Sequence, residues 1–206
     1  MKVILINGSP RKEGCTYTAL CEVAGALNGN GIRTEIFHIG QKAVSGCLAC
    51  GFCGQSGFCA IDDVVAEFAD IADGADGFVF GSPVHFASAA GSMISFMDRV
   101  FYSKRAAFKG KPAAAVVSCR RGGATASFDQ MNKYFSISQM PIVTSQYWNM
   151  VHGHTPEQVK QDLEGLQTMR TLGNNMAWLL KCIKAGKSAG IEHPEGEQRI
   201  STNFIR

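Results

Sequence analysis

The feature that most constrains this fold is a regular alternation of short apolar runs with segments of helical periodicity. The first run, residues 3–6, is continuously apolar, as expected for a strand covered on both faces. Apolar residues then recur at helical spacing over residues 20–27, before the helix stop signal Asn28–Gly31. The later segments predicted as strands are residues 34–37, 78–80, 113–117 and 142–144. This alternation predicts an α/β fold in which helices cover both faces of a five-stranded parallel sheet.

The remaining helical segments have recognisable starts. Asp62 is predicted to cap one helix, and Pro156 to occupy the first position of a long helix that ends at about Ala185. Two further helices are expected over about 90–101 and 125–138. Because no linker interrupts the pattern, residues 1–206 are predicted to form a single domain, with a cysteine-rich loop at about 45–60 and a polar tail from about 186.

Composition excludes several classes of protein. Hydrophobic residues make up 46% of the chain and charged residues 18%, which is typical of a folded globular protein. A net charge of +3 gives no reason to expect binding to nucleic acid or an anionic membrane, and no apolar stretch reaches bilayer length. We therefore expect a cytoplasmic protein with reduced thiols, so that its eight cysteines serve metal or redox chemistry rather than disulfides.

The loop after the first apolar run has the composition of a phosphate-binding loop. Residues 7–16 combine glycine, small hydroxyl side chains and two cations just before a helix, whose first backbone N–H groups are free to bind an anion. The loop matches neither the Walker A pattern nor the dinucleotide fingerprint. This disfavours the binding of a nucleoside triphosphate and of a dinucleotide in a Rossmann-type site. The alternative is an ordinary strand-to-helix turn without a ligand.

Four cysteines lie within thirteen residues, with the spacing C-x2-C-x2-C-x5-C. Thiolates are soft ligands, so the set Cys47, Cys50, Cys53 and Cys59 favours a [4Fe–4S] cluster and, less strongly, zinc. The two separated C-x2-C pairs of a typical structural zinc site are absent from the sequence. The alternative is a metal-free thiol loop.

Several motifs occur in an order that resembles the flavodoxin-like NAD(P)H-dependent FMN reductases. They are Gly8-Ser9-Pro10-Arg11, Gly81-Ser82-Pro83-Val84-His85-Phe86, Met97-Asp98-Arg99 and Ser118-Cys119-Arg120-Arg121-Gly122-Gly123. The resemblance implies a flavodoxin-like three-layer sandwich that binds FMN. It also implies a set of flavin-binding residues: Ser9, Arg11, Cys15, Thr16, Ser82, Pro83, Val84, His85, Phe86, Ser118, Arg120 and Gly122. His85 departs from the tyrosine that is commoner in the family.

The compact cysteine run resembles the iron–sulfur flavoprotein branch of that family, which carries such a run between the second strand and second helix. The resemblance implies an FMN-dependent oxidoreductase that takes electrons from NAD(P)H or a redox protein such as ferredoxin, and passes them to a quinone, a flavin or another small acceptor. It also implies a homodimer or homotetramer. The alternative function is an electron carrier or redox sensor with a [4Fe–4S] cluster. No dedicated catalytic side chain is expected, because the flavin carries the chemistry.

Overall fold

The computed structural model describes residues 1–198, 200–202 and 204, and places a six-stranded sheet at the centre of the molecule. Five of the strands are parallel, in the order β2-β1-β3-β5-β6. These strands are β1 (Lys2–Asn7), β2 (Arg33–His38), β3 (Gly77–His85), β5 (Ala113–Cys119) and β6 (Met150–His152). The short strand β4 (Ser88–Ala89) pairs antiparallel with the end of β3. The predicted five-stranded parallel sheet is thus present, with one small strand added.

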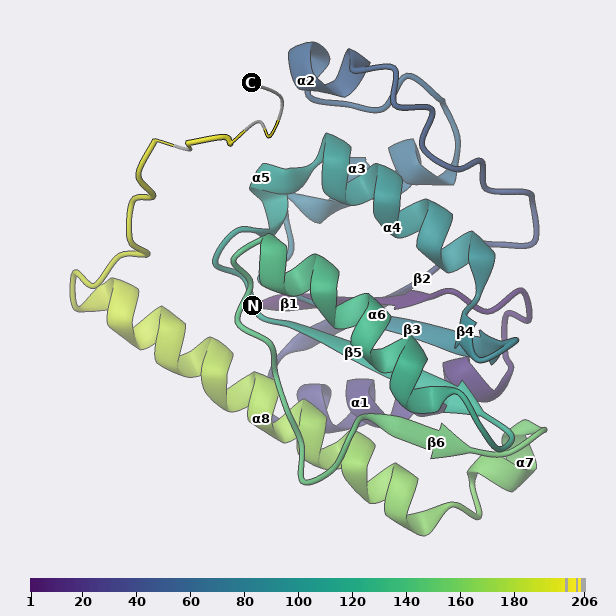
Figure 1. Ribbon diagram of the computed structural model, residues 1–206. Coiled ribbons are helices and arrows are strands. Elements are labelled where there is room, and N and C mark those ends of the chain that lie inside the picture. Colours follow the sequence, from purple (N-terminus) through teal and green to yellow (C-terminus); the bar gives the residue numbers. More distant parts are fainter. Residues whose placement is uncertain (199, 203, 205–206) are drawn as a thin grey trace.

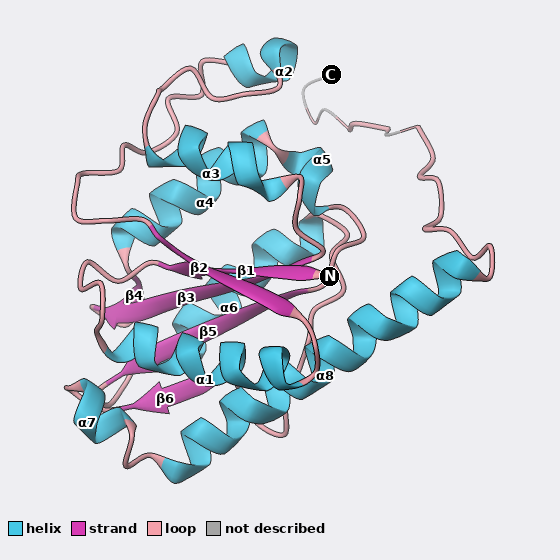
Figure 2. Ribbon diagram, turned by 180° about the vertical axis from the view of Figure 1, so that it is seen from behind, coloured by secondary structure: helices cyan, strands magenta, loops and turns pink. Residues whose placement is uncertain are grey.

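Helices cover both faces of this sheet (Figures 1 and 2). One face carries α1 (Cys15–Gly29) and α8 (Leu163–Ser188), which pack against each other. The other face carries α3 (Val64–Ala72), α4 (Gly91–Ser103) and α6 (Ala124–Ile137). Three shorter helices lie in connections: α2 (Phe52–Ser56), α5 (Arg105–Phe108) and α7 (Pro156–Val159). The molecule is therefore a three-layer α/β sandwich, as the sequence predicts.

Two separate cores lie on the two faces of the sheet, because successive side chains of a strand point to opposite faces. In β1, Val3 and Leu5 pack toward α1 and α8, whereas Ile4 and Ile6 pack toward α3 and α4. All four side chains are fully buried. The continuous apolar run in the sequence is explained by this burial on both faces.

The strand order reverses at β1. β2 lies on one side of β1, and β3 lies on the other. In doubly wound sheets of this kind, the loops after the two strands at the reversal diverge and leave a crevice at the carboxyl edge, where ligands bind. The loops after β1, β3 and β5 meet at this edge.

The predicted fifth strand was placed wrongly. Residues 142–144, all within the described chain, contribute only one isolated bridge, between Ile142 and Ala113. The fifth parallel strand is instead β6, whose Met150, Val151 and His152 pair with the end of β5. Both segments lie beside β5, but residues 141–143 hydrogen-bond only to its first residue, Ala113, whereas β6 pairs with its last three residues. The extent of pairing, and not local apolar character, decides which segment is a strand.

Two predicted helix starts also need correction. The residue that caps α3 is Asp63, not Asp62: its Oδ1 accepts a hydrogen bond from the Val65 backbone N–H at 3.0 Å. Pro156 does occupy the first turn of a helix, but this is the short α7. The chain turns after Val159, and α8 begins anew after Asp162, whose Oδ1 accepts from the Gly165 N–H at 2.9 Å.

The polar tail begins later than predicted, because α8 continues to Ser188. Residues 191–198 are exposed and belong to no helix or strand, whereas residues 199, 203, 205 and 206 lie outside the described residues. Within the described part of the chain, none of the helices combines the length and the apolar character that a membrane crossing requires.

Candidate functional site

The carboxyl edge of the sheet contains a cavity of about 340 Å³, which we call the carboxyl-edge cavity. Nine of the twelve residues that the sequence predicts to bind a flavin line it: Ser9, Arg11, Cys15, Thr16, Pro83, Val84, His85, Ser118 and Arg120. These residues come from the loop after β1 with the start of α1, from the carboxyl end of β3, and from the end of β5 with the loop that follows it. The topology therefore brings three segments that are far apart in the sequence to one cavity.

The loop after β1 is held in shape by its own polar groups. The side-chain Oδ1 of buried Asn7 accepts a hydrogen bond from the Ser9 N–H at 3.1 Å, and its Nδ2 donates to the Lys12 carbonyl at 2.9 Å. The Ser9 Oγ accepts from the Arg11 N–H at 3.1 Å. A further hydrogen bond joins the Gly8 N–H to the Gly81 carbonyl at 2.8 Å, so the loop is also fixed to β3.

The N-terminus of α1 faces the cavity and is suited to an anion. Its N-cap residue is Gly14, and no hydrogen bond from a side chain of the described residues caps the helix. The first backbone N–H groups and the positive end of the helix dipole are therefore open to a phosphate. Arg11 and Arg120 add positive charge to the cavity lining. The Thr16 and Ser118 hydroxyl groups, which also belong to the lining, form a hydrogen bond with each other, with 2.8 Å between their oxygens.

The segment after β3 forms a hairpin with β4 at the cavity rim. Its two turn residues, Phe86 and Ala87, have left-handed backbones with φ of 51° and 61°. Such a turn favours glycine or asparagine, so each of these residues carries conformational strain. Strain of this kind is concentrated at functional sites, where the surrounding fold maintains it.

Three predicted residues lie outside the cavity lining. Phe86 is fully exposed at the hairpin tip. Ser82 is buried beneath the hairpin, where its Oγ donates to the Pro83 carbonyl at 2.9 Å and accepts from the Ala90 N–H at 3.0 Å. Gly122 is followed by Gly123, a left-handed residue with φ of 91° that packs directly against Ala87. Ser82 and Gly123 therefore support the rim from behind.

Sequence reasoning missed four lining residues: Pro10, Cys119, Gly153 and His154. Gly153 and His154 follow β6, so the wrong position of the fifth strand hid them. Cys119 is buried at the end of β5. Burial raises the pKa of both Cys15 and Cys119, which keeps these thiols protonated at neutral pH.

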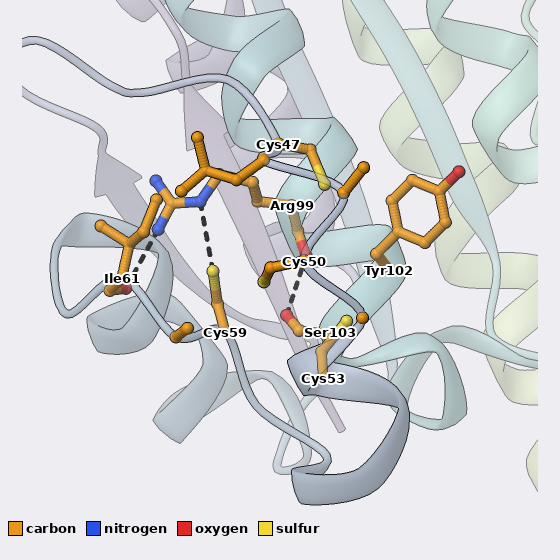
Figure 3. Close-up of a pocket in the computed structure, with 12 residues that line it drawn as sticks. Cys47, Cys50, Cys53, Cys59, Ile61, Arg99, Tyr102 and Ser103 are labelled. Atoms are coloured by element: carbon orange, nitrogen blue, oxygen red, sulfur yellow. Dashed lines mark hydrogen bonds between the residues drawn. The ribbon is translucent and has the colours of Figure 1, made fainter.

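The four cysteines of the compact run line a second cavity, of about 380 Å³, between the loop and α4 (Figure 3). Cys47 and Cys50 are exposed, and Cys53 and Cys59 are partly buried. Gly51 and Gly57, on either side of α2, have left-handed backbones that let the loop curl around the hollow. We call residues 46–60 the cysteine segment.

The donor chemistry of this cavity fits an iron–sulfur cluster better than a single ion. Zinc draws four thiolates to about 2.3 Å from one centre. Within the described residues, no three His, Cys, Asp or Glu side chains are close enough together to hold a metal ion. A four-iron cluster is a larger centre that is bound by four thiolates, and four cysteines surround one hollow here.

Comparisons with known proteins agree with this geometry. The sequence model of the NADPH-dependent FMN reductase family matches residues 1–155. The chain is 35% identical to an iron–sulfur flavoprotein of Methanocaldococcus jannaschii, over 89% of this chain and 100% of that protein. It is 29% identical to an iron–sulfur flavoprotein of Methanosarcina thermophila, over 91% of this chain and 99% of that protein.

A solved flavodoxin from the domain Archaea superposes with a TM-score of 0.60 at 16% identity, over 88% of this chain and 99% of that structure. This likeness shows the fold alone. The predicted flavodoxin-like architecture is therefore confirmed.

Proposed function

Because the chain belongs to the NADPH-dependent FMN reductase family, we propose that the carboxyl-edge cavity binds FMN and that the protein is a flavin-dependent oxidoreductase. Its electrons would come from NAD(P)H or a redox protein and pass to a quinone, a flavin or another small acceptor. One observation carries the proposal: nine expected flavin residues, from three segments far apart in the sequence, line one cavity at the reversal of strand order.

The phosphate of FMN would lie at the N-terminus of α1. There the backbone N–H groups of the first turn, the Ser9 and Thr16 side chains and the Arg11 guanidinium all surround one end of the cavity. Amide donors and a guanidinium suit a dianion, because charge-assisted hydrogen bonds are the strong ones. The Asn7 bonds hold these donors in place before the ligand arrives.

The isoalloxazine ring would lie against the hairpin rim, formed by Pro83, Val84 and His85. When bound, FMN supplies the hydride and electron chemistry, which no side chain of a protein can perform. The residues of this chain orient the ring and exclude water from one face. The Arg120 and His154 side chains line the same cavity and would contact the ring edge or an incoming substrate.

The test is flavin binding and its reduction. We expect protein purified without oxygen to carry FMN and to be bleached rapidly by NADPH or NADH. Arg11→Met should weaken FMN binding, because it removes one charge at the phosphate end. Arg33→Met removes one charge from the exposed start of β2, at the opposite edge of the sheet, and should bind FMN as the wild type does. Equal FMN affinity in both variants would contradict the assigned phosphate site.

A second candidate function is an electron carrier or redox sensor with a [4Fe–4S] cluster on the cysteine segment. The four cysteines around one cavity favour it, as does similarity to relatives named iron–sulfur flavoproteins. Iron and acid-labile sulfide analysis of protein purified without oxygen tests the cluster. Bleaching of the flavin by reduced ferredoxin, but not by NADPH or NADH, would favour the carrier. A metal-free or zinc-loaded segment would contradict it.

We further propose that the protein forms a homodimer or homotetramer. Large aromatic side chains are exposed on the protein: Phe86 at the hairpin tip, and Tyr147 and Trp148, whose ring centroids lie 4.8 Å apart in an edge-to-face contact. Exposed aromatic side chains are enriched at protein interfaces. Light scattering that gives a monomeric mass at micromolar concentration would contradict this proposal.

A further inference from the structure

Arg99 is a charged residue in the core of the protein. It lies on α4, and only 1% of its surface is exposed. A buried guanidinium is costly unless its N–H groups are bonded and its charge is paired. Here every nitrogen of the guanidinium has at least one partner, and all the partners lie in the chain between β2 and the first turn of α3.

Asp63 fixes the guanidinium in one orientation. Its two carboxylate oxygens accept hydrogen bonds from Nη1 at 2.6 Å and Nη2 at 2.8 Å, a bidentate arrangement that leaves the arginine little freedom. Burial acts to raise the pKa of Asp63, but the hydrogen bonds from Arg99 and from the Val65 N–H outweigh it and lower that pKa. The carboxylate is therefore ionised at neutral pH, and the pair is a true ion pair.

The other N–H groups of the guanidinium reach both ends of the cysteine segment. Nη1 also lies 3.5 Å from the Ser45 carbonyl, just before the segment, and Nη2 donates to the Ile61 carbonyl, just after it, at 3.0 Å. Nε lies 3.3 Å from the Sγ of Cys59 (Figure 3). One side chain thus joins the two ends of the segment and contacts one of its four sulfurs.

We propose that Arg99 is a positioning residue for Cys59: held by Asp63, it fixes this sulfur at the cavity and donates a hydrogen bond to it, which aids cluster retention and raises the reduction potential of the cluster. The inference rests on the proposed [4Fe–4S] cluster. Cys47 and Cys50 are exposed, and Cys53 lies on the short helix α2. Among the described residues, Cys59 is the one cysteine of the four whose sulfur accepts a hydrogen bond, so it is the ligand fixed before assembly.

The effect on potential follows from electrostatics. A thiolate ligand carries negative charge, and reduction adds one more electron to the cluster. A positive charge and an N–H donor at the sulfur stabilise the reduced state more than the oxidised one, and hydrogen bonds to ligand sulfurs are among the factors that set cluster potentials. A purely structural role for Arg99, by contrast, would require only the Asp63 pair and the two carbonyl bonds.

The experiment compares Arg99→Lys with the wild type. Lysine keeps the charge that pairs with Asp63, but it has no planar group that can reach both Cys59 and the two carbonyls at once. The matched control is Lys104→Met, just beyond the end of the same helix, which removes the surface ion pair with Asp73. Each protein is purified without oxygen. Iron and sulfide per chain, the rate of iron loss to a chelator, the cluster midpoint potential and FMN per chain are then measured on the same sample.

We expect Arg99→Lys to lose iron roughly 10- to 100-fold faster than the wild type, as is typical when a group that supports a metal ligand is removed. The midpoint potential should move to a more negative value, with FMN per chain unchanged. Lys104→Met should match the wild type in all four measurements. If Arg99→Lys does not fold, as judged by circular dichroism, Asp63→Asn serves instead. For this variant we expect a smaller negative shift of the midpoint potential and a smaller increase in the rate of iron loss.

Two outcomes overturn the proposal and are distinguishable. In the first outcome, the wild type takes up iron and sulfide, and Arg99→Lys has the same rate of iron loss and the same cluster midpoint potential. The role of Arg99 is then refuted, while the cluster stands. If the wild type takes up neither iron nor sulfide, the proposed cluster is refuted and the role of Arg99 with it. In that second case FMN per chain still reports on the carboxyl-edge cavity.

Discussion

The carboxyl-edge cavity and the cavity of the cysteine segment both hold proposed cofactor ligands, but the protein maintains them in different ways. The first is formed by loops that continue directly from buried parallel strands, and it is fixed by bonds such as Gly8 N–H to the Gly81 carbonyl. The second is formed by one long connection between β2 and α3 that lies outside the sheet (Figure 1). Its Cys47 and Cys50 are exposed.

The difference shows what each site needs in order to form. The carboxyl-edge cavity exists as soon as the sheet forms, because its walls are strand ends and a helix N-terminus. The cysteine segment is instead held at its two ends by Arg99, and between them by the short helix α2 and the contact of Phe52 with Phe58. Changes to the first site should therefore affect stability and flavin together, whereas changes to the second should affect the metal centre alone.

The largest effect is expected for Gly123→Ala, at the rim of the carboxyl-edge cavity. A Cβ at Gly123 would lie 2.4 Å from the Ala87 Cα, and the left-handed φ of 91° disfavours any other residue. Backbone strain and overpacking together should cost about 2–4 kcal/mol of unfolding free energy. Denaturant unfolding measures this loss, and FMN per chain should fall with it.

The matched control is Gly122→Ala, at the neighbouring residue. A Cβ there would have open space around it, so unfolding free energy should change by less than about 0.5 kcal/mol. A loss below about 1 kcal/mol in Gly123→Ala would show that the hairpin gives way easily, against the rigid rim described above.

An intermediate effect is expected for Thr16→Val, which removes one of the two hydroxyls that join the first turn of α1 to the end of β5. The Thr16 and Ser118 oxygens are 2.8 Å apart and buried, so the change leaves the Ser118 hydroxyl without this partner. The expected cost is about 1 kcal/mol, with weaker FMN binding measured by fluorescence titration. Thr16→Ser keeps the hydroxyl and should retain most of the affinity. Equal losses in the two variants would assign the effect to the methyl group.

The smallest effect on the fold is expected for Cys47→Ser in the cysteine segment. This side chain is exposed, so unfolding free energy of the metal-free protein should change by no more than about 0.5 kcal/mol. FMN per chain should stay constant, while iron and sulfide per chain should fall sharply. Parallel loss of FMN and iron would show that the two sites are not independent and would break the comparison.

The sequence predicts β1, β3 and β5 because each is buried on both faces and therefore reads as an apolar run. The edge strand β2 is only partly buried, and its place is predicted from the strand–helix alternation. The same reasoning from local residue character placed the fifth strand at the wrong segment. Ile142, in the β-branched segment 142–144, is 38% exposed, while β6 joins the sheet through its register with β5. Register depends on tertiary packing, which apolar patterning does not encode. The loss of Gly153 and His154 from the predicted site follows from that single error.

The site prediction is correct for residues that lie at the carboxyl ends of strands, because the sheet topology alone brings these ends together. Loops after β1, β3 and β5 reach one edge in any sheet of this order, so Ser9, Pro83 and Ser118 could be grouped from the sequence. The contact between Arg99 and Cys59 could not, because it joins residues 40 positions apart through side-chain packing. Likewise, sequence alone does not separate Asp62 from Asp63 as the cap, but the ion pair with Arg99 does.

The bonds from one guanidinium to Ser45 and Ile61 also bear on how such a protein changes during evolution. They bring the two ends of the cysteine segment within reach of each other. A short turn could therefore replace residues 46–60 without moving β2 or α3, because closing a short loop costs less entropy than closing a long one. The four cysteines of the segment thus lie in a single connection whose ends meet at one side chain, so a change confined to that connection would add or remove all four without changing the sheet.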